Sequence, residues 1–469
     1  MASSAYSSLT PARAQGRRVL VITPEPLPLP GQATTGAGLR AWGLTMGLRM
    51  RGFDAIVASC NVAFSDTYLT GQQPLPGHVR MFQRNRADVL LEEVKPQVVV
   101  LQHWGMAHEL PDINVPLAID LAGPHLLERL YWGSPDIIAD AEAKLAALRR
   151  ADFVVCSGEY QRHYFYAWLA MAGFDLRKTE VPVIPFSVPP VEQLPGDTSR
   201  EPYSMVYGGM LLAWQDPSRA LRVVLEEMER AGRGRLHVYT GTHPVLDASG
   251  DHLASLMTEL RNHPRVELHG IQPFDKLLQE YARYEVALDL MARNPERELA
   301  FTTRTMIYLA CGLPVIHNDY SELAGLVRRY GGGWTLSPDD EGGLRNLCRM
   351  LLGESRQLES VRAQARALAE QFTWDKTIEP LASFCQAPAL RADKRTTLLR
   401  VETLTAELQH EREKRIAVEQ ELAALRGKLF VRLAVTLSGL KRHMAPLVWF
   451  AAWPIARGIE WILRRQSAR

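Results

Sequence analysis

The chain carries two successive series of short, almost uninterrupted apolar runs, each run followed by a segment long enough for a helix. Strands that are apolar throughout are typical of a parallel sheet covered by helices on both faces. Alternation of such strands with helices predicts an α/β fold, in which the strand-helix-strand connections are right-handed. The sequence therefore predicts two Rossmann-like, doubly wound domains in tandem.

The first predicted domain covers residues 17–190. Its first strand leads into the segment "TTGAGLRAWGLTMGLRMRG", whose apolar residues recur at helical spacing and whose Thr34 or Thr35 is a suitable N-cap. Strands are expected at 17–23, 53–59, 96–105, 115–123 and 151–158.

The second predicted domain covers residues 191–385 and begins with a polar linker at 191–202. Turn residues separate six apolar runs, and a helix is expected at Thr303–Ala310. The six strands are expected at 203–209, 234–241, 264–270, 284–291, 311–318 and 331–337.

The two ends of the chain differ from these domains. Residues 1–16 are polar and rich in Ser and Ala, so we expect a disordered leader rather than a signal peptide. Leucines and valines of 386–430 fit an a/d heptad pattern, which predicts a coiled-coil helix and possible homo-oligomers through 397–430. Residues 431–469 read as a basic amphipathic tail suited to an anionic inner-membrane surface. A helical hairpin packed on the body is the alternative for this tail.

The charge and the cysteine pattern argue against a nucleic-acid partner, a disulfide framework and a cysteine zinc site. The net charge is only +2, so nothing in the overall balance calls for nucleic acid. The five cysteines lie far apart with no C-x-x-C pair, which argues against a disulfide framework or a zinc site. We expect a cytoplasmic protein, peripheral on the inner face of the cell membrane if the tail binds lipid.

Ligands of doubly wound sheets bind beyond the carboxyl ends of the strands, and two such sheets in tandem leave a cleft there. In "MVYGGMLLAWQDPSRAL", Gly208 and Gly209 follow a strand and leave room for a bulky ligand. Asp216 is placed to N-cap the next helix, with Pro217 in its first turn. His243 follows the second strand of the same domain and is another candidate contact.

The stretch "ELAFTTRTMIYLACGLPVIHNDYSEL" suggests a diphosphate site. The helix at 303–310 would direct free N–H groups into the cleft, where Arg304 adds a bidentate phosphate contact. Glu298 suits sugar hydroxyls, and Asp319 lies just beyond the following strand.

These motifs resemble those of bacterial GT-B nucleotide-sugar glycosyltransferases of the GT4-like kind, over roughly residues 17–385. In the first domain, "IDLAGPHLLERL", "ADFVVCSGEYQRHYF" and "VIPFSVPP" are similar to motifs of one bacterial subgroup. The resemblance implies a retaining, metal-independent hexosyl or deoxyhexosyl transferase of surface polysaccharide synthesis that acts on a saccharide or lipid-linked acceptor. The implied donor-site residues are Gly208, Gly209, Trp214, Asp216, His243, Glu298, Arg304 and Thr305.

Two departures from the family pattern affect the expected chemistry. Ile307 occupies the place of a helix glutamate, and a lysine near the Gly-rich loop is absent. We then expect Arg304 to neutralise the phosphates, with Arg219 as a second candidate. We expect no metal and no cofactor, because no D-x-D pattern is found and the nucleotide sugar is itself a co-substrate.

On the acceptor side, Gly36 and Gly38 open a helix at the cleft. If the enzyme inverts configuration, a base must come from the first domain, and His103, Asp120 and His125 each follow a strand that ends there. His103 is the preferred base.

Three other classes remain as alternatives. A GT-B-type nucleotide-sugar epimerase would share the architecture but need no acceptor. A non-catalytic scaffold stays open as an alternative because Ile307 stands in the place of the helix glutamate. An NAD dehydrogenase fits least, because no G-x-G-x-x-G with a following ribose-binding acid is found.

Overall fold

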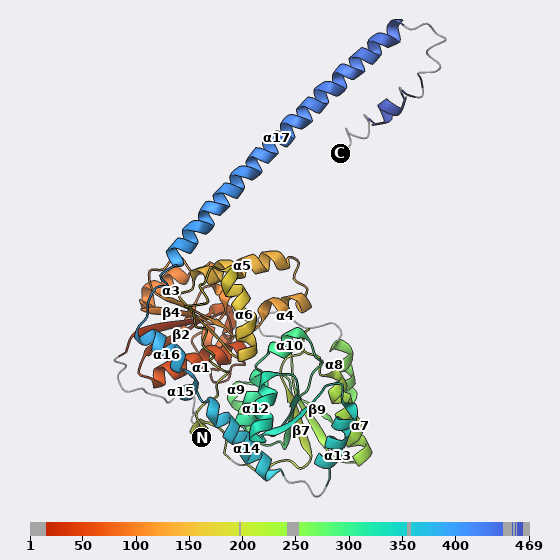
Figure 1. Cartoon of the computed structure of the whole chain (residues 1–469). Coiled ribbons are helices and arrows are strands. Elements are labelled where there is room, and N and C mark those ends of the chain that lie inside the picture. The colour runs from red at the N-terminus through yellow and green to blue at the C-terminus, as the bar shows by residue number, and fades with distance from the viewer. Residues whose placement is uncertain are drawn as a thin grey trace. The chain divides into compact units, whose positions relative to one another are not determined.

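The structure of the protein is a computed structural model that describes residues 16–196, 198–241, 253–353, 358–443, 453, 455 and 457–462. The chain divides into two compact units, the first ending at Lys394 and the second beginning at Arg395. Two six-stranded sheets lie within the first unit, each in its own lobe (Figure 1). The predicted leader falls almost entirely outside the described residues.

The first lobe is built on a fully parallel sheet of strand order β3-β2-β1-β4-β5-β6. Its strands are β1 (Arg18–Thr23), β2 (Asp54–Cys60), β3 (Val79–Phe82), β4 (Val98–Leu101), β5 (Leu117–Leu121) and β6 (Phe153–Cys156). The accompanying helices are α1 (Gly36–Met50), α2 (Asp66–Leu69), α3 (Ala87–Val94), α4 (His125–Trp132), α5 (Ile137–Arg150) and α6 (Glu159–Met171). Alternate residues of β1 join different cores, Leu20 and Ile22 on one face and Val19 and Val21 on the other, which is why these four consecutive residues are all apolar.

The second lobe repeats this plan with the parallel order β12-β11-β10-β7-β8-β9. Its strands are β7 (Ser204–Gly208), β8 (Arg235–Tyr239), β9 (Val266–Leu268), β10 (Val286–Asp289), β11 (Val315–Asn318) and β12 (Gly333–Leu336). Its helices are α7 (Ser218–Ala231), α8 (Leu253–Asn262), α9 (Phe274–Tyr281), α10 (Pro295–Leu299), α11 (Thr303–Ala310), α12 (Glu322–Tyr330), α13 (Glu341–Leu351) and α14 (Glu359–Ala369). The predicted α/β class and the two Rossmann-like domains are confirmed.

The end of the first unit returns to the first lobe. Helices α15 (Trp374–Thr377) and α16 (Glu379–Gln386) contribute Trp374, Ile378 and Leu381 to the core around α1 (Figure 1). Gly43 and Gly47 of α1 permit this packing, since an added Cβ would lie 3.1 Å from the Trp374 Nε1 atom and 2.7 Å from the Trp374 carbonyl oxygen respectively. The predicted boundary at residue 385 therefore falls too late, because these apolar side chains are buried in the first lobe.

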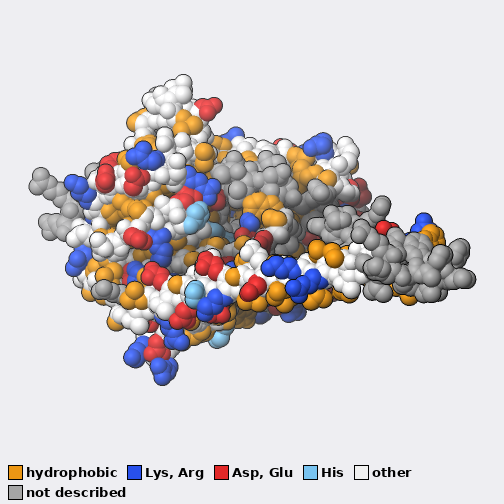
Figure 2. All heavy atoms as spheres, turned by 90° about the horizontal axis from the view of Figure 1, so that it is seen from above, with side chains coloured by type: hydrophobic (Ala, Val, Ile, Leu, Met, Phe, Trp, Pro, Cys, Tyr) orange, Lys and Arg blue, Asp and Glu red, His pale blue; other side chains and the backbone are white. Residues whose placement is uncertain are grey.

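In the second unit, α17 runs from Lys394, at the end of the first unit, to His443. Its Leu404, Leu408, Leu422 and Leu425 are exposed. Within the described residues, no helix has the length and apolar character needed to cross a membrane. Figure 2 shows basic and acidic side chains intermixed over the face that it presents, in keeping with the small net charge.

Candidate functional site

A cavity of about 730 Å³ lies between the two lobes and is lined by residues that follow the strands of both sheets. The first lobe contributes His103 after β4 and Gly123 after β5. The second lobe contributes Gly209 after β7 and Gly241 after β8. The cavity thus occupies the place where parallel sheets of this kind bind ligands.

The N-terminus of α11 faces this cavity. Thr302, Thr303 and Arg304 line it. The first backbone N–H groups of a helix have no intrahelical acceptor, and the N-cap Thr302 makes no side-chain capping bond to them. Such a helix end favours an anion, because unpaired N–H groups and the helix dipole act together. The predicted helix bounds at 303–310 agree with the structure.

Arg304 is held over the cavity by three neighbours. Its Nη2 donates to the Gln215 Oε1 atom at 2.9 Å, its Nη1 lies 3.2 Å from Asp289 Oδ1, and its guanidinium carbon is 4.9 Å from the centre of the Tyr207 ring. The Nε atom is buried and has no hydrogen-bond partner among the described residues. Burial pulls the pKa of Arg304 down, but Tyr207 and Asp289 more than offset this, so the group stays charged.

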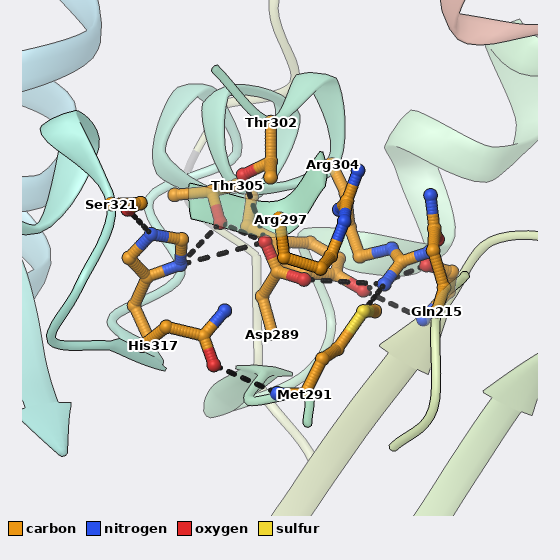
Figure 3. Close-up of polar contacts among 12 residues, drawn as sticks. Gln215, Asp289, Met291, Arg297, Thr302, Arg304, Thr305, His317 and Ser321 are labelled. Atoms are coloured by element: carbon orange, nitrogen blue, oxygen red, sulfur yellow. Dashed lines mark hydrogen bonds and ion pairs between the residues drawn. The ribbon is translucent and has the colours of Figure 1, made fainter. Parts of the chain in front are cut away.

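Asp289, at the end of β10, is the centre of a buried network (Figure 3). Its Oδ2 accepts hydrogen bonds from Thr302 Oγ1 at 2.8 Å and Thr305 Oγ1 at 2.6 Å. His317 lies on the other side, with its Nδ1 3.5 Å from Asp289 Oδ2. Although burial opposes its ionisation, His317, Arg304 and Thr305 hold the pKa of Asp289 far below its usual range. The carboxylate therefore fixes both the start of α11 and the position of Arg304.

Gly208 and Gly209 line the cavity as the sequence predicts. Gly209 has φ of +130°, and an added Cβ would lie 2.3 Å from Arg304 Nη2. A Cβ on Gly208 would lie 1.7 Å from the Tyr281 hydroxyl. The two glycines are therefore needed for packing beneath the cavity as well as for space within it. Trp214 also lines the cavity.

The carboxylate that enters the cavity from α10 is Glu296 rather than Glu298. Glu296 is 1% exposed and pairs with the neighbouring Arg297, and both line the cavity. Glu298 instead pairs with Arg293 at the surface and is not among the lining residues. Residues two positions apart on a helix do not face the same way, which explains the difference.

Several other predicted donor residues lie outside the cavity lining. Asp216 accepts from the Ser218 backbone N–H at 2.9 Å and so caps the start of α7, which begins one residue later than expected. Thr305 is buried against Asp289, and Asp319 is exposed beyond β11. Arg219 is half-exposed and pairs with Asp339, so it does not join Arg304 at the cavity as a second phosphate contact. His243 lies outside the described residues.

On the acceptor side, His103 lines the cavity but is unsuited to act as a base. Its Nδ1 accepts a hydrogen bond from the Gly105 backbone N–H at 2.8 Å, so the neutral ring carries its proton on Nε2. Burial, together with nearby His125 and Lys144, lowers the pKa of His103 well below its ordinary value. The lone pair that would take a proton is therefore already occupied.

His125 has the arrangement that His103 lacks. Its Nδ1 lies 3.0 Å from Glu128 Oε2, and its Nε2 has no hydrogen-bond partner among the described residues. Burial lowers the pKa of His125, but the Glu128 carboxylate more than offsets this and the net shift is upward. Both residues line the cavity. The carboxylate orients the ring and leaves Nε2 as an acceptor for a ligand hydroxyl.

Of the remaining residues predicted on the acceptor side, one lines the cavity and two do not. Gly36 lines the cavity and lies against Thr303 of the other lobe, whose Oγ1 would be 3.0 Å from an added Cβ. Gly38 does not line it; it packs against the Pro26 carbonyl, 2.0 Å from an added Cβ. Asp120 is buried in a two-bond pair with Arg40, at 2.8 Å for each bond, and it is Arg40 that reaches the cavity lining.

Sequence reasoning missed Asp289, Gln215, Glu128 and the Glu296–Arg297 pair. Asp289 lies in the apolar run "YEVALDLM" as the last residue of β10, and a carboxylate at the end of a parallel strand was an available signal. Glu128 follows His125 by three residues, which places both on one helix face. Gln215 had no signal in the sequence, because its role depends on the position of Arg304.

No family model matches the chain, and no curated protein matches it. Solved structures do. Sucrose-phosphate synthase from Thermosynechococcus elongatus aligns with a TM-score of 0.57 at 16% identity, covering 78% of this chain and 98% of that one. HepE of Anabaena in complex with UDP-glucose aligns with a TM-score of 0.56 at 14% identity, covering 78% and 98%. A mutant of S. aureus TarM, solved with UDP, alpha-GlcNAc-glycerol and Fondaparinux, aligns with a TM-score of 0.57 at 8% identity, covering 79% and 100%.

Two Rossmann-like lobes that enclose a cavity at their strand ends define the architecture. Together with these matches, they show that the chain has the GT-B fold of glycosyltransferases. The resemblance found in the sequence is confirmed at the level of the fold.

Proposed function

We propose that the protein is a glycosyltransferase that moves a sugar from a nucleotide-sugar donor to a saccharide or lipid-linked saccharide acceptor. The observation that carries the proposal is the N-terminus of α11, where Arg304 faces the cavity between the lobes. A leaving diphosphate needs charge stabilisation, which the helix N–H groups and Arg304 supply without a metal ion at the phosphate. Two of the matched structures are complexes with UDP-glucose or UDP, which supports this class of donor.

The residues divide into three roles in this proposal. Arg304 and the start of α11 bind the diphosphate, while Gly208 and Gly209 give it room. Glu296 accepts hydrogen bonds from hydroxyls of the donor sugar. His125, oriented by Glu128, accepts a hydrogen bond from a hydroxyl of the donor sugar or the acceptor.

We propose retention of anomeric configuration, with the donor phosphate assisting deprotonation of the acceptor. The engagement of His103 and Asp120 in other bonds supports this, because neither is free to act as a base. If transfer inverts instead, His125 is the base that the geometry favours. NMR of the product anomer distinguishes the two.

The first experiment is a thermal-shift screen of the full-length protein against nucleotide sugars and free nucleotides. Binding to the folded state raises Tm by mass action, so the correct nucleotide should stand out. Transfer is then measured with the best donor and a set of saccharide acceptors. No stabilisation by any nucleotide sugar, with the protein folded, would overturn the proposal.

A non-catalytic nucleotide-sugar binding protein is the second candidate. The apolar Ile307 lines the cavity in the place where the resembled family carries a glutamate. Binding of a nucleotide sugar without turnover, epimerisation or hydrolysis across the acceptor panel would favour this candidate.

We further propose that the C-terminal region anchors the protein at an anionic membrane and that its product enters bacterial surface polysaccharide. Among the described residues of 431–469, Trp453, Ile455 and Trp461 are exposed, and Arg457 lies over the Trp453 ring. Flotation with anionic and neutral vesicles tests this. The full chain should float with anionic vesicles only, and a chain lacking 397–469 with neither.

A further inference from the structure

A cluster of histidine and carboxylate side chains lies on β8 and β9, outside the residues that line the cavity. His237 of β8 and Glu267 of β9 are direct neighbours across the parallel ladder, so their side chains leave the same face of the sheet. His269 directly follows β9, and its backbone N–H still donates to the Val238 carbonyl at 3.0 Å, so the strand pattern continues and its side chain leaves the same face as Glu267. Because strand pairing brings them together, linear spacing along the sequence does not reveal the group.

The ligand-type atoms of the three residues converge. His237 Nδ1 lies 3.0 Å from His269 Nε2 and 3.8 Å from Glu267 Oε2, and His269 Nε2 lies 3.8 Å from Glu267 Oε1. Bonds from Zn²⁺ to histidine nitrogen are about 2.0 Å long, so atoms closer than roughly 4 Å can share one ion. All three separations meet this condition.

A second carboxylate lies beside the other ring nitrogen of His237. Glu201 Oε2 lies 3.1 Å from His237 Nε2, on the opposite side of the ring from the cluster. A carboxylate on the far nitrogen is the usual partner of a metal-binding histidine, because it holds the proton there and leaves the other nitrogen free. His237 also stacks on Tyr284, with ring centres 4.3 Å apart, and is almost fully buried.

The charged neighbours of the two histidines are Glu201, Glu267 and, around His269, Glu280 and Lys276. Arg235 also lies 3.4 Å from Glu267 Oε2 and competes for that carboxylate.

We propose that His237, Glu267 and His269 form a binding site for a divalent transition metal of the Zn²⁺ class. Two imidazoles and one carboxylate are a donor set that Zn²⁺ accepts, with water in the fourth position. The side chains of His269 and Glu267 are 20% and 47% exposed, so the ion can enter from solvent. The ion would tie the edge strand β9 to β8, next to Gly270–Gln272, which line the cavity.

The expectation of no zinc site rests on cysteine spacing and does not consider this group. The donor chemistry proposed for the cavity does not involve it either. The site can therefore be tested without a glycosyl donor.

The test is titration of the full-length, metal-free protein with Co²⁺, followed by displacement with Zn²⁺. Visible ligand-field absorption at a single equivalent of Co²⁺, lost on addition of Zn²⁺, is the expected result. E267Q and H269N should abolish it, and E201Q should weaken binding by about 10–100-fold. Circular dichroism establishes that each variant is folded.

His263 provides the matched control, because its Nε2 lies 3.2 Å from Glu229 Oε1 in a histidine–glutamate pair outside the cluster. H263Q should bind Co²⁺ as the wild type does. Absence of Co²⁺ binding by the wild type, or binding unchanged in both folded E267Q and H269N, would overturn the proposal. The His237–His269 contact would then be a hydrogen bond alone.

Discussion

Arg304 has two dependencies that a substitution must separate. It faces the proposed diphosphate, and it also pairs with the buried Asp289. Removing one partner of a buried pair leaves an uncompensated charge, at a cost of roughly 3–5 kcal/mol of stability. R304K keeps the charge but loses the planar, bidentate donor, so it is the more informative change.

We expect R304K to lower kcat/KM for the donor while the protein stays folded, and R304A to lower it by about 10²–10³-fold. Steady-state kinetics with the nucleotide sugar found by thermal shift provide the measurement. R219Q is the matched control, because Arg219 is exposed and lies outside the cavity lining. Wild-type kcat/KM in R304K would contradict the diphosphate contact.

The His125–Glu128 pair predicts how both stability and activity change with pH. The folded pKa of His125 is raised above 6.5. The pair's contribution to stability is therefore fully present below pH 6.5 and is lost as pH rises through the folded pKa. Activity should show the opposite trend, because Nε2 can accept a hydrogen bond only when the ring is neutral. In the pH profile of kcat/KM, we therefore expect kcat/KM to rise with pH through the pKa of His125, which lies above 6.5. This rising part of the profile is its acid limb.

E128Q should move this limb to lower pH, because it removes the negative charge that raises the pKa of His125. H125Q should abolish the limb and reduce activity, whereas H103Q should leave the limb in place. A limb that stays at the same pH in E128Q would show that another group titrates.

At the scale of elements, the contact of α1 with α15 depends on two glycines. G47A would place a methyl group 2.7 Å from the Trp374 carbonyl oxygen and 2.8 Å from Ile378 Cβ. Overpacking of this kind costs typically 1–3 kcal/mol, so we expect the free energy of unfolding to fall by about that amount. Denaturant unfolding followed by tryptophan fluorescence measures the change.

Gly325 in α12 is the matched control, because an added Cβ there meets nothing within 4 Å. G325A should be neutral or stabilise the protein by about 0.4–1 kcal/mol through the unfolded state. Equal destabilisation by G47A and G325A would show that the packing of α15 against α1 does not decide the outcome, because helix propensity alone favours alanine at both positions.

The apolar runs were sufficient to predict eleven of the twelve strands in the topology, and the helix at 303–310. Strand β3 was missed because "VRMF" is short and carries an arginine, a weak signal beside the longer runs. The site was less predictable. Arg304 was predicted correctly from a helix-start signal. Glu298 was predicted in place of Glu296, because the five-residue α10 has no periodic apolar pattern from which to infer which residues face the cavity.

Side-chain availability was the least predictable property. His103, Asp120 and His125 were all expected to lie where strands end at the cavity, and His103 was the preferred base. A backbone N–H occupies His103 and Arg40 occupies Asp120, and both partners are set by tertiary structure. Only coordinates distinguish a free imidazole nitrogen from an engaged one.

At the scale of the whole molecule, α17 presents an a/d stripe that includes Leu404, Leu408, Leu422 and Leu425, each about half exposed. We predict that this stripe pairs with that of a second copy. Light scattering should show an oligomer for the full chain and a monomer for L408E/L422E. A406E/A424E is the matched control and should stay oligomeric, because both positions lie outside the stripe. A monomeric wild type would rule out the coiled coil.

The chain crosses between the lobes twice, and the crossings are bonded to each other. The Val188 backbone N–H donates to the Phe372 carbonyl at 2.9 Å, and the Trp374 N–H donates to the Val188 carbonyl at 3.1 Å. Since α15 and α16 supply core residues to a lobe that starts near residue 17, a ribosome must synthesise the entire second lobe before the first has all its parts. The lobe that is synthesised first is therefore the last to be completed. Until then, the α1 surface that packs against Trp374 stays exposed and can contact apolar segments of other chains.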